Sequence, residues 1–438
     1  MNEQGPASES KPKLRVLILA SKLGYQTRGF ADAAEKLGAE IVFATDRCHK
    51  LEDPWGDGAL PLQFERPEES AEEIARAMGA HPPNTILALG DRATTAAACA
   101  ARALGLPGNS PESAAICRNK LRQRETVRKA GLPVPEFFAI SLDEEIERIL
   151  PRVGFPCVLK PLGLAASQGV IRADDERSFA AALNRIRALL ESPEIQVLRE
   201  PGTEQVLVEK YIPGKEFAIE GLMTEGRLRV LAIFDKPEPL EGPYFEETIY
   251  VTPSRLADAA QTELCECARK TVRALGLQHG PLHAEFRMNE RGPWVLEAAA
   301  RPIGGLCSRA LRFGPEKISL EELLLRHALG LAGSELEREA QASGVMMIPV
   351  PRSGIFEGVK GLEEAEKLSG VEEIRITVRL KDYIAAWPEG SSYLGFIFAR
   401  AEKPNEVEEA LHKAHARMQF VFSPRLPVEH PVTRRISA

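Results

Sequence analysis

The stretch LHAEFRMNERGPWVLEAAAR, residues 282–301, is typical of a β-hairpin. Apolar and polar residues alternate strictly in its first half, which places Glu285 on the polar face of a strand. Pro293 has no N–H to donate to a strand ladder, so the sequence predicts a five-residue loop over residues 289–293. In that register Glu285 lies directly opposite Glu297.

Two glutamates that face each other across a hairpin have Cβ atoms about 5 Å apart. One or two Mg²⁺ (or Mn²⁺) ions would neutralise them, because Mg²⁺ prefers a few carboxylates completed by phosphate oxygens and water. Two alternatives stay open: Arg287 or Arg301 forms a salt-bridge lattice with the glutamates, or the register slips by one residue. We interpret His283, beside Glu285, as a packed strand residue rather than a group that orients the glutamate.

A second set of candidate residues precedes the hairpin. Lys160 ends the apolar strand CVLKP and leads into a small-residue segment at residues 163–169. Backbone N–H groups of such a loop can contact phosphate oxygens, and a lysine adds a compact positive charge. Lys120 lies in a helical segment, and the strand VLVEKYI ends in Pro-Gly, where exposed main-chain groups could contact adenine. Taken singly, these features also fit an ordinary turn, a solvated lysine and an edge strand.

The first 110 residues alternate between strand and helix patterns. LRVLILA (residues 14–20) and TILALG (residues 85–90) are apolar runs typical of buried strands. The alternation predicts a parallel sheet with helices on its faces, and ligands bind beyond the carboxyl ends of such strands. The turn at residues 21–29 is therefore a candidate site. The chain lacks the G-x-G-x-x-G and G-x-x-x-x-G-K-[ST] motifs of nicotinamide and P-loop enzymes.

Turn-rich and polar segments divide the chain. GLPGNSPES (residues 105–113) precedes one long helix predicted over residues 114–130. A polar segment at residues 330–344 precedes short strands and a helix. We therefore expect three domains, at residues 1–113, 114–332 and 333–438.

The composition indicates a folded protein whose partners are small molecules. Lys+Arg 56 against Asp+Glu 63 leaves a net charge of −7, which argues against nonspecific binding to nucleic acid or anionic membranes. Ordinary contents of Gly (34) and Pro (32) exclude a disordered or collagen-like chain. The seven cysteines form no C-x-x-C pair, so we expect buried thiols in a reducing compartment. No signal-like segment and no apolar run of about 18 residues is present, so we expect a cytoplasmic protein.

In this order, the segments resemble the ATP-grasp superfamily of carboxylate–amine ligases. The similarity to its L-amino-acid ligase branch, of the bacilysin-synthetase type, lies in DKPEPLEGPYFEETIYVTPSRL (residues 235–256), EAAARPIGGL (residues 297–306) and IPVPRSGIFEGVKGLEEA (residues 348–365). The resemblance covers nearly the whole chain from about residue 14. It implies a mixed α/β and α+β fold: an N-terminal Rossmann-like parallel-sheet domain, a central two-subdomain ATP-binding unit with a lid at about residues 150–212, and a small C-terminal α+β domain.

The resemblance also implies residues that bind ATP. Lys120 and Lys160 would hold the α- and β-phosphates. Residues 165–169, with Ser167 and Gly169 among them, would close over the β- and γ-phosphates. Adenine would contact Glu209, Lys210, Tyr211 and Ile212. The ribose would contact Glu216.

The same resemblance implies a metal site and a catalytic set. Glu285 and Glu297 would ligate Mg²⁺, and Arg301 would contact the γ-phosphate or an acyl phosphate. Arg301, Lys160 and Glu297 form the implied catalytic set. Many ATP-grasp enzymes carry E-x-N at the second metal position, whereas Ala299 stands here in place of Asn. One oxygen ligand is therefore absent, and a second ion would be held more loosely or by Glu297 in a bidentate manner.

Substrate selection would fall to EGPYFEETIY and RPIGGL. Glu246 or Glu247 could bind a substrate ammonium group, and Tyr250 could line the pocket. The backbone N–H groups of Gly304 and Gly305 could bind a carboxylate. A solvent-facing loop and a simple helix-entry turn are the alternative interpretations of these two segments.

The activity implied is that of a ligase that converts a carboxylate into an acyl phosphate with ATP and joins it to an amine, such as that of a second amino acid. Phosphoryl transfer mainly needs alignment and charge stabilisation, which Mg²⁺, two lysines and an arginine supply. Two alternatives stay open: an ATP-grasp enzyme that uses bicarbonate or a nucleotide precursor, and a non-catalytic nucleotide-binding regulatory protein. We expect small-molecule carboxylate and amine substrates as partners, and the resemblance also implies a homodimer.

Overall fold

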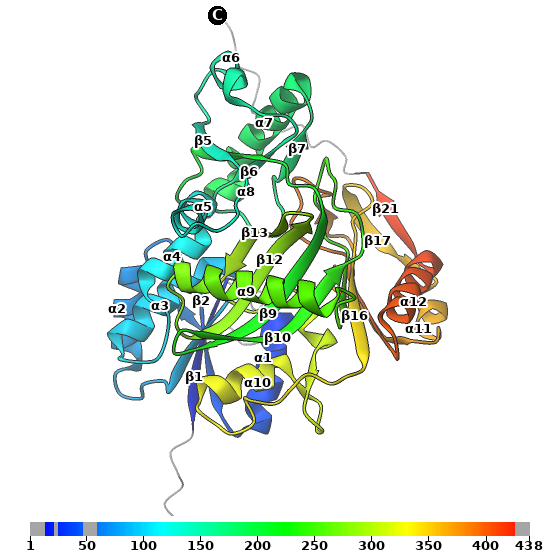
Figure 1. Cartoon of the computed structure of the whole chain (residues 1–438). Coiled ribbons are helices and arrows are strands. Elements are labelled where there is room, and N and C mark those ends of the chain that lie inside the picture. Colours follow the sequence, from blue (N-terminus) through cyan, green and yellow to red (C-terminus); the bar gives the residue numbers. More distant parts are fainter. Residues whose placement is uncertain (1–13, 22–24, 47–58, 425–438) are drawn as a thin grey trace, which may run out of the picture.

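The computed structural model describes residues 14–21, 25–46 and 59–424. Figure 1 shows the lid above a central sheet, the N-terminal domain at the lower left and the C-terminal elements at the right. Residues 22–24 of the candidate turn and Cys48 lie outside the described residues. Within the described ranges, none of the helices has the length and apolar character needed to cross a bilayer.

The N-terminal domain contains the parallel sheet predicted from the sequence. Its strand order is β3-β2-β1-β4, and β1 pairs in parallel with both of its neighbours. Alternate residues of β1 enter two different hydrophobic cores, so both faces of the sheet are covered. The elements are β1 (Arg15–Ala20), α1 (Tyr25–Lys36), β2 (Glu40–Thr45), β3 (Leu60–Pro61), α2 (Pro67–Met78), β4 (Thr85–Leu89), η1 (Asp91–Ala93) and α3 (Thr94–Ala103).

Two helices replace the single long helix predicted after this domain. α4 (Pro111–Arg118) ends and α5 (Lys120–Lys129) begins around Asn119, whose backbone is extended at φ −110° and ψ 110°. The side chain of Asn119 accepts a hydrogen bond from the backbone N–H of Arg122 at 3.0 Å, which caps α5. Asparagine is also tolerated inside helices, so the sequence pattern contains no clear stop. The break places Lys120 in the first turn of a helix.

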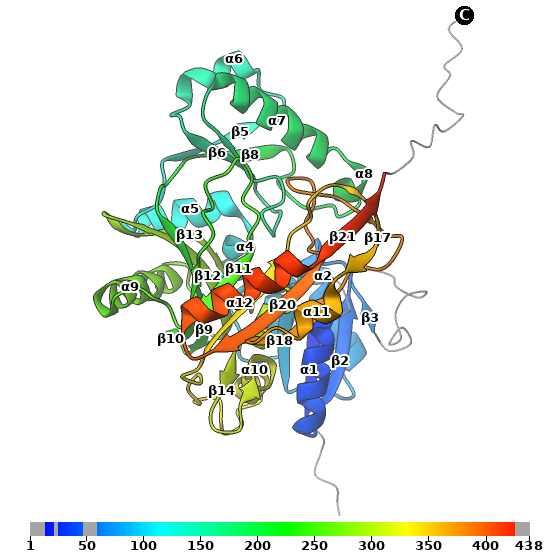
Figure 2. The same cartoon turned by 90° about the vertical axis from the view of Figure 1, so that its right-hand side faces the viewer.

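The lid is a four-stranded antiparallel sheet with the order β5-β8-β6-β7. α7 (Glu176–Leu190) packs on it through a fully buried apolar stripe that includes Phe179 and Leu183. Figure 2 shows the lid from the side, raised above the central sheet. The other elements are β5 (Phe137–Ser141), α6 (Ile146–Ile149), η2 (Leu150–Arg152), β6 (Cys157–Pro161), β7 (Ile171–Ala173), α8 (Pro193–Gln196) and β8 (Gln205–Lys210).

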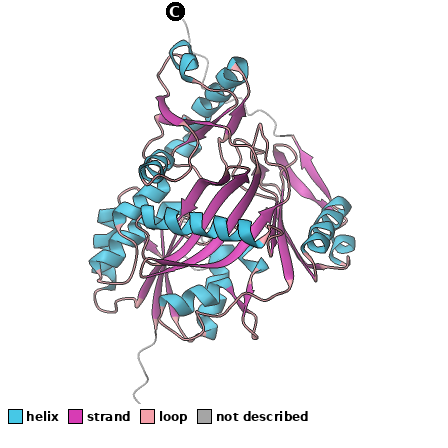
Figure 3. Cartoon of the chain, in the orientation of Figure 1, coloured by secondary structure: helices cyan, strands magenta, loops and turns pink. Residues whose placement is uncertain are grey.

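The central sheet has eight strands in the order β13-β12-β9-β10-β11-β16-β20-β18. Its last three strands come from the C-terminal part of the chain, so this part extends the central sheet and does not form a separate one. α9 (Asp258–Ala274) crosses one face of the sheet, as Figures 1 and 3 show. The strands are β9 (Lys215–Thr224), β10 (Arg227–Lys236), β11 (Ile249–Thr252), β12 (Gly280–Asn289), β13 (Gly292–Ala299), β16 (Ala342–Ile348), β18 (Val371–Ile376) and β20 (Gly395–Ala401).

The β12–β13 hairpin is tighter than the sequence suggested. Asn289 pairs with Gly292, so the predicted five-residue loop is wrong and the turn contains two residues. A bulge at Leu296 then adds one residue to β13 and shifts the register by one. The short turn and the bulge offset each other. Glu285 therefore lies opposite Glu297 as predicted, although the loop that led to the prediction does not exist.

The remaining elements surround the end of the central sheet. A three-stranded sheet with the order β19-β17-β21 lies beside β20, and α12 packs along the latter strand (Figure 2). These elements are β17 (Gly354–Lys360), α11 (Leu362–Glu366), β19 (Tyr383–Ile384), α12 (Pro404–Arg417) and β21 (Gln419–Ser423). The segment after β13 forms η3 (Cys307–Ala310), β14 (Arg312–Phe313), β15 (Ile318–Ser319) and α10 (Leu320–Ala328).

Candidate functional site

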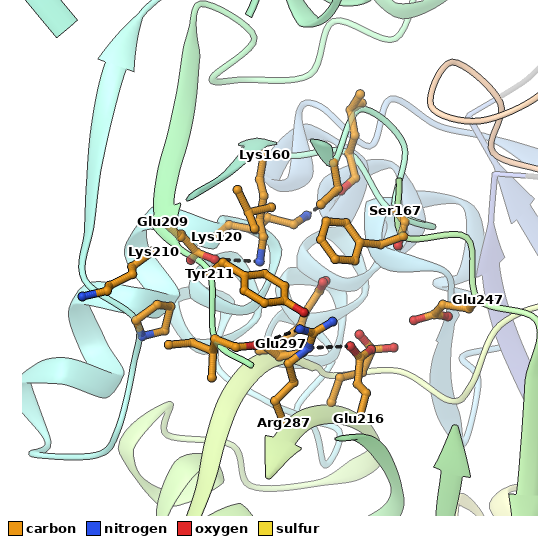
Figure 4. Close-up of a pocket in the computed structure, with 18 of the residues that line it drawn as sticks. Lys120, Lys160, Ser167, Glu209, Lys210, Tyr211, Glu216, Glu247, Arg287 and Glu297 are labelled. Carbon is orange, nitrogen blue, oxygen red and sulfur yellow. Dashed lines mark hydrogen bonds and ion pairs between the residues drawn. The ribbon is translucent and has the colours of Figure 1, made fainter. Parts of the chain in front are cut away.

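The lid and the central sheet enclose a cleft with two adjoining chambers, the first of which is drawn in Figure 4. The first chamber has an empty volume of about 720 Å³ and lies under the lid. The second has an empty volume of about 1150 Å³ and extends to the N-terminal domain and to η3. The wall between them is shared and contains Ala165, Ser167, Glu247, Glu285 and Glu297.

The structure brings the predicted site residues together. The residues predicted to bind nucleotide line the first chamber, apart from Gly169, which lies in the same loop. The second chamber holds Tyr250, Arg301, Gly304 and Gly305, which were predicted to act on substrate.

Lys160 is held in the first chamber by a buried ion pair. Its Nζ lies 2.6 Å from Glu209, whose carboxylate also binds Arg124 at 2.5 Å. Burial alone would raise the pKa of Glu209, but the two cations lower it to about 2. Burial lowers the pKa of Lys160, and Glu209 offsets this effect only in part because the nearby guanidinium of Arg124 lowers the pKa further. The Glu209 carboxylate therefore positions Lys160 and is not free to contact adenine.

Lys120 ties α5 to the segment that follows β6. Its backbone N–H donates to the carbonyl of Leu162 at 3.3 Å, and its Nζ donates to the carbonyl of Leu164 at 2.6 Å. The lysine predicted to hold phosphate thus also anchors the start of the small-residue loop, residues 163–169. The break at Asn119 makes this contact possible because it turns the first residue of α5 toward the lid.

The small-residue loop has a conformation suited to binding anions. Ala166 and Ser167, both at φ 54°, and Gly169, at φ 72°, adopt the left-handed region. A Cβ at Gly169 would lie 2.8 Å from Pro161, so only glycine fits there without a shift. Among the described residues, no hydrogen bond engages the backbone N–H groups of residues 165–167. Consecutive free N–H groups of this kind form a concave site for phosphate oxygens.

The opposite wall of the first chamber presents an aromatic ring and a free backbone group. The guanidinium of Arg287 lies 4.9 Å from the ring centre of Tyr211 and donates to the carbonyl of Ile212 at 2.7 Å. Within the described chain, the N–H of Ile212 has no hydrogen-bond partner. The side chain of Lys210 is exposed and points out of the pocket in Figure 4. Ile212 can therefore offer a donor to an adenine edge, whereas Lys210 can contribute only its backbone.

Lys236, which was not predicted from the sequence, lies at the centre of an acidic group formed by Glu216, Glu247 and Glu285. Its Nζ lies 2.8 Å from Glu216, 2.6 Å from Glu247 and 2.9 Å from Glu285. Burial alone would lower the pKa of Lys236, but the three carboxylates raise it well above its usual value. Burial together with Glu285 raises the pKa of Glu247 to about 7. In the structure Lys236 of β10 pairs with Glu216 of β9, beyond a bulge that shifts the register of the two strands.

Both oxygens of Glu216 are engaged, one with Lys236 and the other with Arg287 at 3.1 Å. The ribose contact predicted for Glu216 would have to displace one of these buried interactions. Its position instead lets Glu216 link two cations of the chamber. The role on ribose stays a prediction.

Glu285 and Glu297 offer the donors that a magnesium ion prefers. Glu297 has no ion pair or side-chain hydrogen bond with any described residue, and the contacts of Glu285 use its Oε1 atom. One carboxylate and one further oxygen thus remain available where the two chambers meet. Mg²⁺ takes one or two carboxylates together with substrate phosphates and water, so the residues present fit this ion.

Arg301 connects the hairpin to the N-terminal domain. Its Nε donates to Asp91 at 2.9 Å, and Asp91 begins η1, two residues after the end of β4. Burial alone would raise the pKa of Asp91, but Arg301 holds it below its ordinary value. The sequence analysis missed Asp91, although the carboxyl ends of parallel strands are where ligand-binding side chains gather.

His283 is buried in β12, which agrees with its interpretation as a packed strand residue, and its ring also contacts two glutamates. Its Nδ1 lies 2.5 Å from Glu220, and its Nε2 lies 3.4 Å from Glu285. Burial alone would lower the pKa of His283, but Glu220 and Glu285 raise it to about 9. Glu220 also accepts a hydrogen bond from the backbone N–H of Ile303 at 3.2 Å. The imidazole therefore links Glu285 to the segment that carries the predicted substrate glycines.

The second chamber distinguishes between the two glutamates proposed for a substrate ammonium group. Glu246 accepts from the backbone N–H of Val350 at 3.1 Å and is not among the residues that line the chamber. Glu247 faces the chamber and accepts from the Tyr250 hydroxyl at 2.7 Å. Gly304 and Gly305, which precede η3, also line this chamber. Their segment is therefore both a turn that leads into η3 and a part of the chamber wall.

Three family models match the chain. They are an ATP-grasp N-terminal domain at residues 31–108, an ATP-grasp domain at residues 153–310 and an L-amino acid ligase C-terminal domain 2 at residues 346–423. The crystal structure of an L-amino acid ligase from Bacillus licheniformis is 28% identical, with a TM-score of 0.78, over 94% of this chain and 100% of that chain. The chain belongs to the L-amino acid ligase branch of the ATP-grasp superfamily.

The alignments of this L-amino acid ligase family member with its curated relatives include only part of each relative. Protein y4rH of Sinorhizobium fredii is 26% identical over 74% of this chain and 65% of the relative. Alanine–anticapsin ligase of Bacillus subtilis is 29% identical over 64% of this chain and 62% of the relative. The chain thus spans less than two thirds of the length of these relatives. Members of the ATP-grasp family use ATP with Mg²⁺.

Proposed function

We propose that the chain is an ATP-dependent ligase that joins the carboxylate of one amino acid to the amine of another. The carboxylate oxygen would attack the γ-phosphorus of ATP, releasing ADP and forming an acyl phosphate. The amine would then attack the acyl carbon, releasing phosphate and a proton. The observation that carries this proposal is the meeting of the two chambers at Glu285 and Glu297, with the lysines on one side and Arg301 on the other.

In the first chamber, Lys120 and Lys160 would hold the α- and β-phosphates, and the free N–H groups of residues 165–167 would bind the terminal phosphates. Adenine would lie against Tyr211 and accept a hydrogen bond from the N–H of Ile212. Mg²⁺ would be held by Glu285 and Glu297, and when bound it would neutralise phosphate oxygens during transfer. The arrangement supports positioning and charge stabilisation, which phosphoryl transfer requires.

In the second chamber, Glu247 would bind the substrate ammonium group and Arg301 would contact the transferred phosphoryl group. Backbone N–H groups of Gly304 and Gly305 would bind the carboxylate that is not activated. An acyl phosphate is hydrolysed by water, so the closed lid would protect it until the amine attacks. The identity of the amino acids depends on the walls of this chamber.

A phosphate-release assay with MgATP and single or paired amino acids tests the proposal. We expect ADP and phosphate in equal amounts with at least one pair, together with a dipeptide detectable by mass spectrometry. Glu297→Ala should abolish release, whereas Lys210→Ala, which removes an exposed side chain, should retain it. Release that required bicarbonate and no amine would identify a carboxylase-type enzyme. Binding of MgATP without phosphate release from any pair would contradict the ligase proposal.

We also propose that the chain divides at about residues 113 and 332, and that it forms a homodimer, as the family resemblance implies. The first boundary falls in the first turn of α4, outside the parallel sheet. Light scattering of the purified protein at micromolar concentration would measure the mass, and a monomer throughout would exclude the dimer.

A further inference from the structure

A segment from the C-terminal part of the chain reaches across the cleft to the lid. Residues 385–394, called the strap here, connect β19 with β20. Trp387 in the strap is buried, with 6% of its surface exposed, and its indole N–H donates to the carbonyl of Ala166 at 3.2 Å. The next carbonyl, that of Pro388, accepts from the N–H of Gly169 at 2.9 Å. The strap thus holds both ends of the left-handed stretch in the small-residue loop.

A second group of contacts joins the strap to α7 of the lid. The carbonyl of Glu389 accepts from the side-chain amide of Gln168 at 2.7 Å. The Glu389 carboxylate forms a two-pronged pair with Arg185 of α7, one prong of which is 2.8 Å long. Arg185 also donates to the Tyr244 hydroxyl at 2.5 Å, in the loop before β11. One arginine of the lid therefore contacts both the strap and the segment that carries Glu247.

The conformation of the small-residue loop needs such support. Ala166 and Ser167 are non-glycine residues in the left-handed region, and residues of this kind persist there only when their surroundings hold them. Lys120 anchors the start of the loop through Leu164. The strap contacts are the hydrogen bonds that hold residues 166–169 from outside the lid.

The other side of the strap belongs to the second chamber. Ser391, Ser392 and Tyr393 line that chamber, and the ring of Tyr393 packs on Trp387 with ring centres 4.9 Å apart. The strap therefore lies between the substrate chamber and the loop that would cover the phosphates. No residue of the strap was among the candidates drawn from the sequence.

We propose that the strap positions the small-residue loop over the nucleotide phosphates, with Trp387 and Glu389 as its positioning residues. The C-terminal part of the chain then supports nucleotide binding in the first chamber as well as lining the second. This inference rests on the proposed function for the identity of the bound phosphates. Its contacts lie within the chain itself, so they can be tested without any amino acid substrate.

Hydrogen–deuterium exchange of the peptide that spans residues 163–170, together with MgADP affinity by calorimetry, tests the strap in the full chain. Trp387→Phe keeps the aromatic ring and removes the N–H donor. We expect about tenfold faster exchange and about tenfold weaker MgADP binding, the effect of losing one supported hydrogen bond. The melting temperature should stay within about 3 °C of wild type, because the packed ring remains.

Charge reversal gives an independent measurement. Glu389→Arg and Arg185→Glu should each raise the exchange rate and weaken MgADP binding several-fold, and the double variant should restore both values. Glu363→Arg, a matched reversal on exposed α11, should change neither. Wild-type exchange and affinity in Trp387→Phe and Glu389→Arg would overturn the proposal, as would a double variant no better than the single ones.

The strap and the ligase proposals fail separately. If no amino acid pair releases phosphate while the strap variants respond as expected, the ligase proposal falls and the strap proposal stands. If the chain is an active ligase and the strap variants change neither the exchange of the small-residue loop nor the MgADP affinity, only the strap proposal fails.

Discussion

At the scale of the residue, the charge balance of the site depends on Lys236. Its side chain is 2% exposed, and its ammonium group lies within hydrogen-bond distance of three carboxylates. Glu216, Glu247 and Glu285 have ligand atoms within 4.8 Å of one another, a geometry that could also hold a metal ion. The lysine cation therefore offsets part of the negative charge of this group from inside, whereas Glu297 forms no ion pair with any described residue.

Lys236→Met should destabilise the protein strongly, because it leaves three buried carboxylates without their shared cation. We expect a loss of about 3–5 kcal/mol in the free energy of unfolding at pH 7, measured by urea denaturation. Lys210→Met removes an exposed lysine and serves as the control, with a change of less than about 0.5 kcal/mol. A neutral result for Lys236→Met would show that the carboxylates do not depend on this lysine.

His327 makes the stability depend on pH outside the cleft. It accepts or donates one hydrogen bond with Thr224 at 2.8 Å and stacks on His279, with ring centres 4.5 Å apart. Burial, with His279 and Arg229 as further causes, lowers the pKa of His327 from 6.5 to about 4. Between these values the unfolded chain binds more protons than the folded chain, so this group destabilises the fold as the pH falls.

We therefore expect wild-type protein to lose about 1 kcal/mol more than His327→Gln between pH 7 and pH 5, after allowing for solvent screening of this half-buried group. Urea denaturation at the two pH values gives the difference directly. Glutamine keeps a hydrogen-bonding group for Thr224 without a titrating ring. An identical pH dependence in the two proteins would contradict the lowered pKa.

At the scale of the element, the break between α4 and α5 places Lys120 in the site. Asn119→Ala removes the cap of α5 and favours one continuous helix. We expect a stability loss of about 1 kcal/mol by thermal or chemical denaturation. MgADP affinity should fall as well, because Lys120 would turn away from Leu164.

Asn119→Asp is the matched control, since aspartate caps a helix about as well as asparagine. It should keep both the stability and the MgADP affinity. Loss of affinity in both variants would indicate that the amide itself, and not the cap, supports the site.

The hairpin shows at the same scale why a correct pairing can follow from an incorrect loop. Alternation along β12 is a local property, so it identified the face that carries Glu285. The bulge at Leu296 depends on how β13 meets β12 and cannot be read from either strand alone. The same limit applies to His283, whose partner Glu220 lies on β9 and becomes its neighbour only when the sheet forms.

At the scale of the whole molecule, the ion pair between Arg301 and Asp91 links the central sheet to the N-terminal domain. Asp91→Asn should leave Arg301 without its charged partner and misplace it. We expect kcat of the proposed ligase reaction to fall about 10–100-fold, because small displacements of a charged group at the reacting centre have effects of this size. MgADP affinity should change little, since Asp91 lines only the second chamber.

Asp32→Asn, on the exposed face of α1, is the control for this substitution and should retain full activity. A phosphate-release assay at saturating substrates measures kcat, and calorimetry measures the affinity. Full activity in Asp91→Asn would show that Arg301 does not need the N-terminal domain.

Local properties of the sequence were enough for the strands and helices of the N-terminal domain, the face of β12 that carries Glu285, and the small-residue loop after Lys160. Each depends on side chains within a few residues of one another, through periodicity, turn chemistry or spacing. The tertiary structure alone decided that Lys236 offsets part of the charge of the acidic group, that Asp91 meets Arg301, and that the strap holds residues 166–169. These contacts join residues 20 to 221 positions apart. Pairing over such distances is set by how strands and domains pack, because no local pattern encodes which distant group will neutralise a buried charge or satisfy a strained loop.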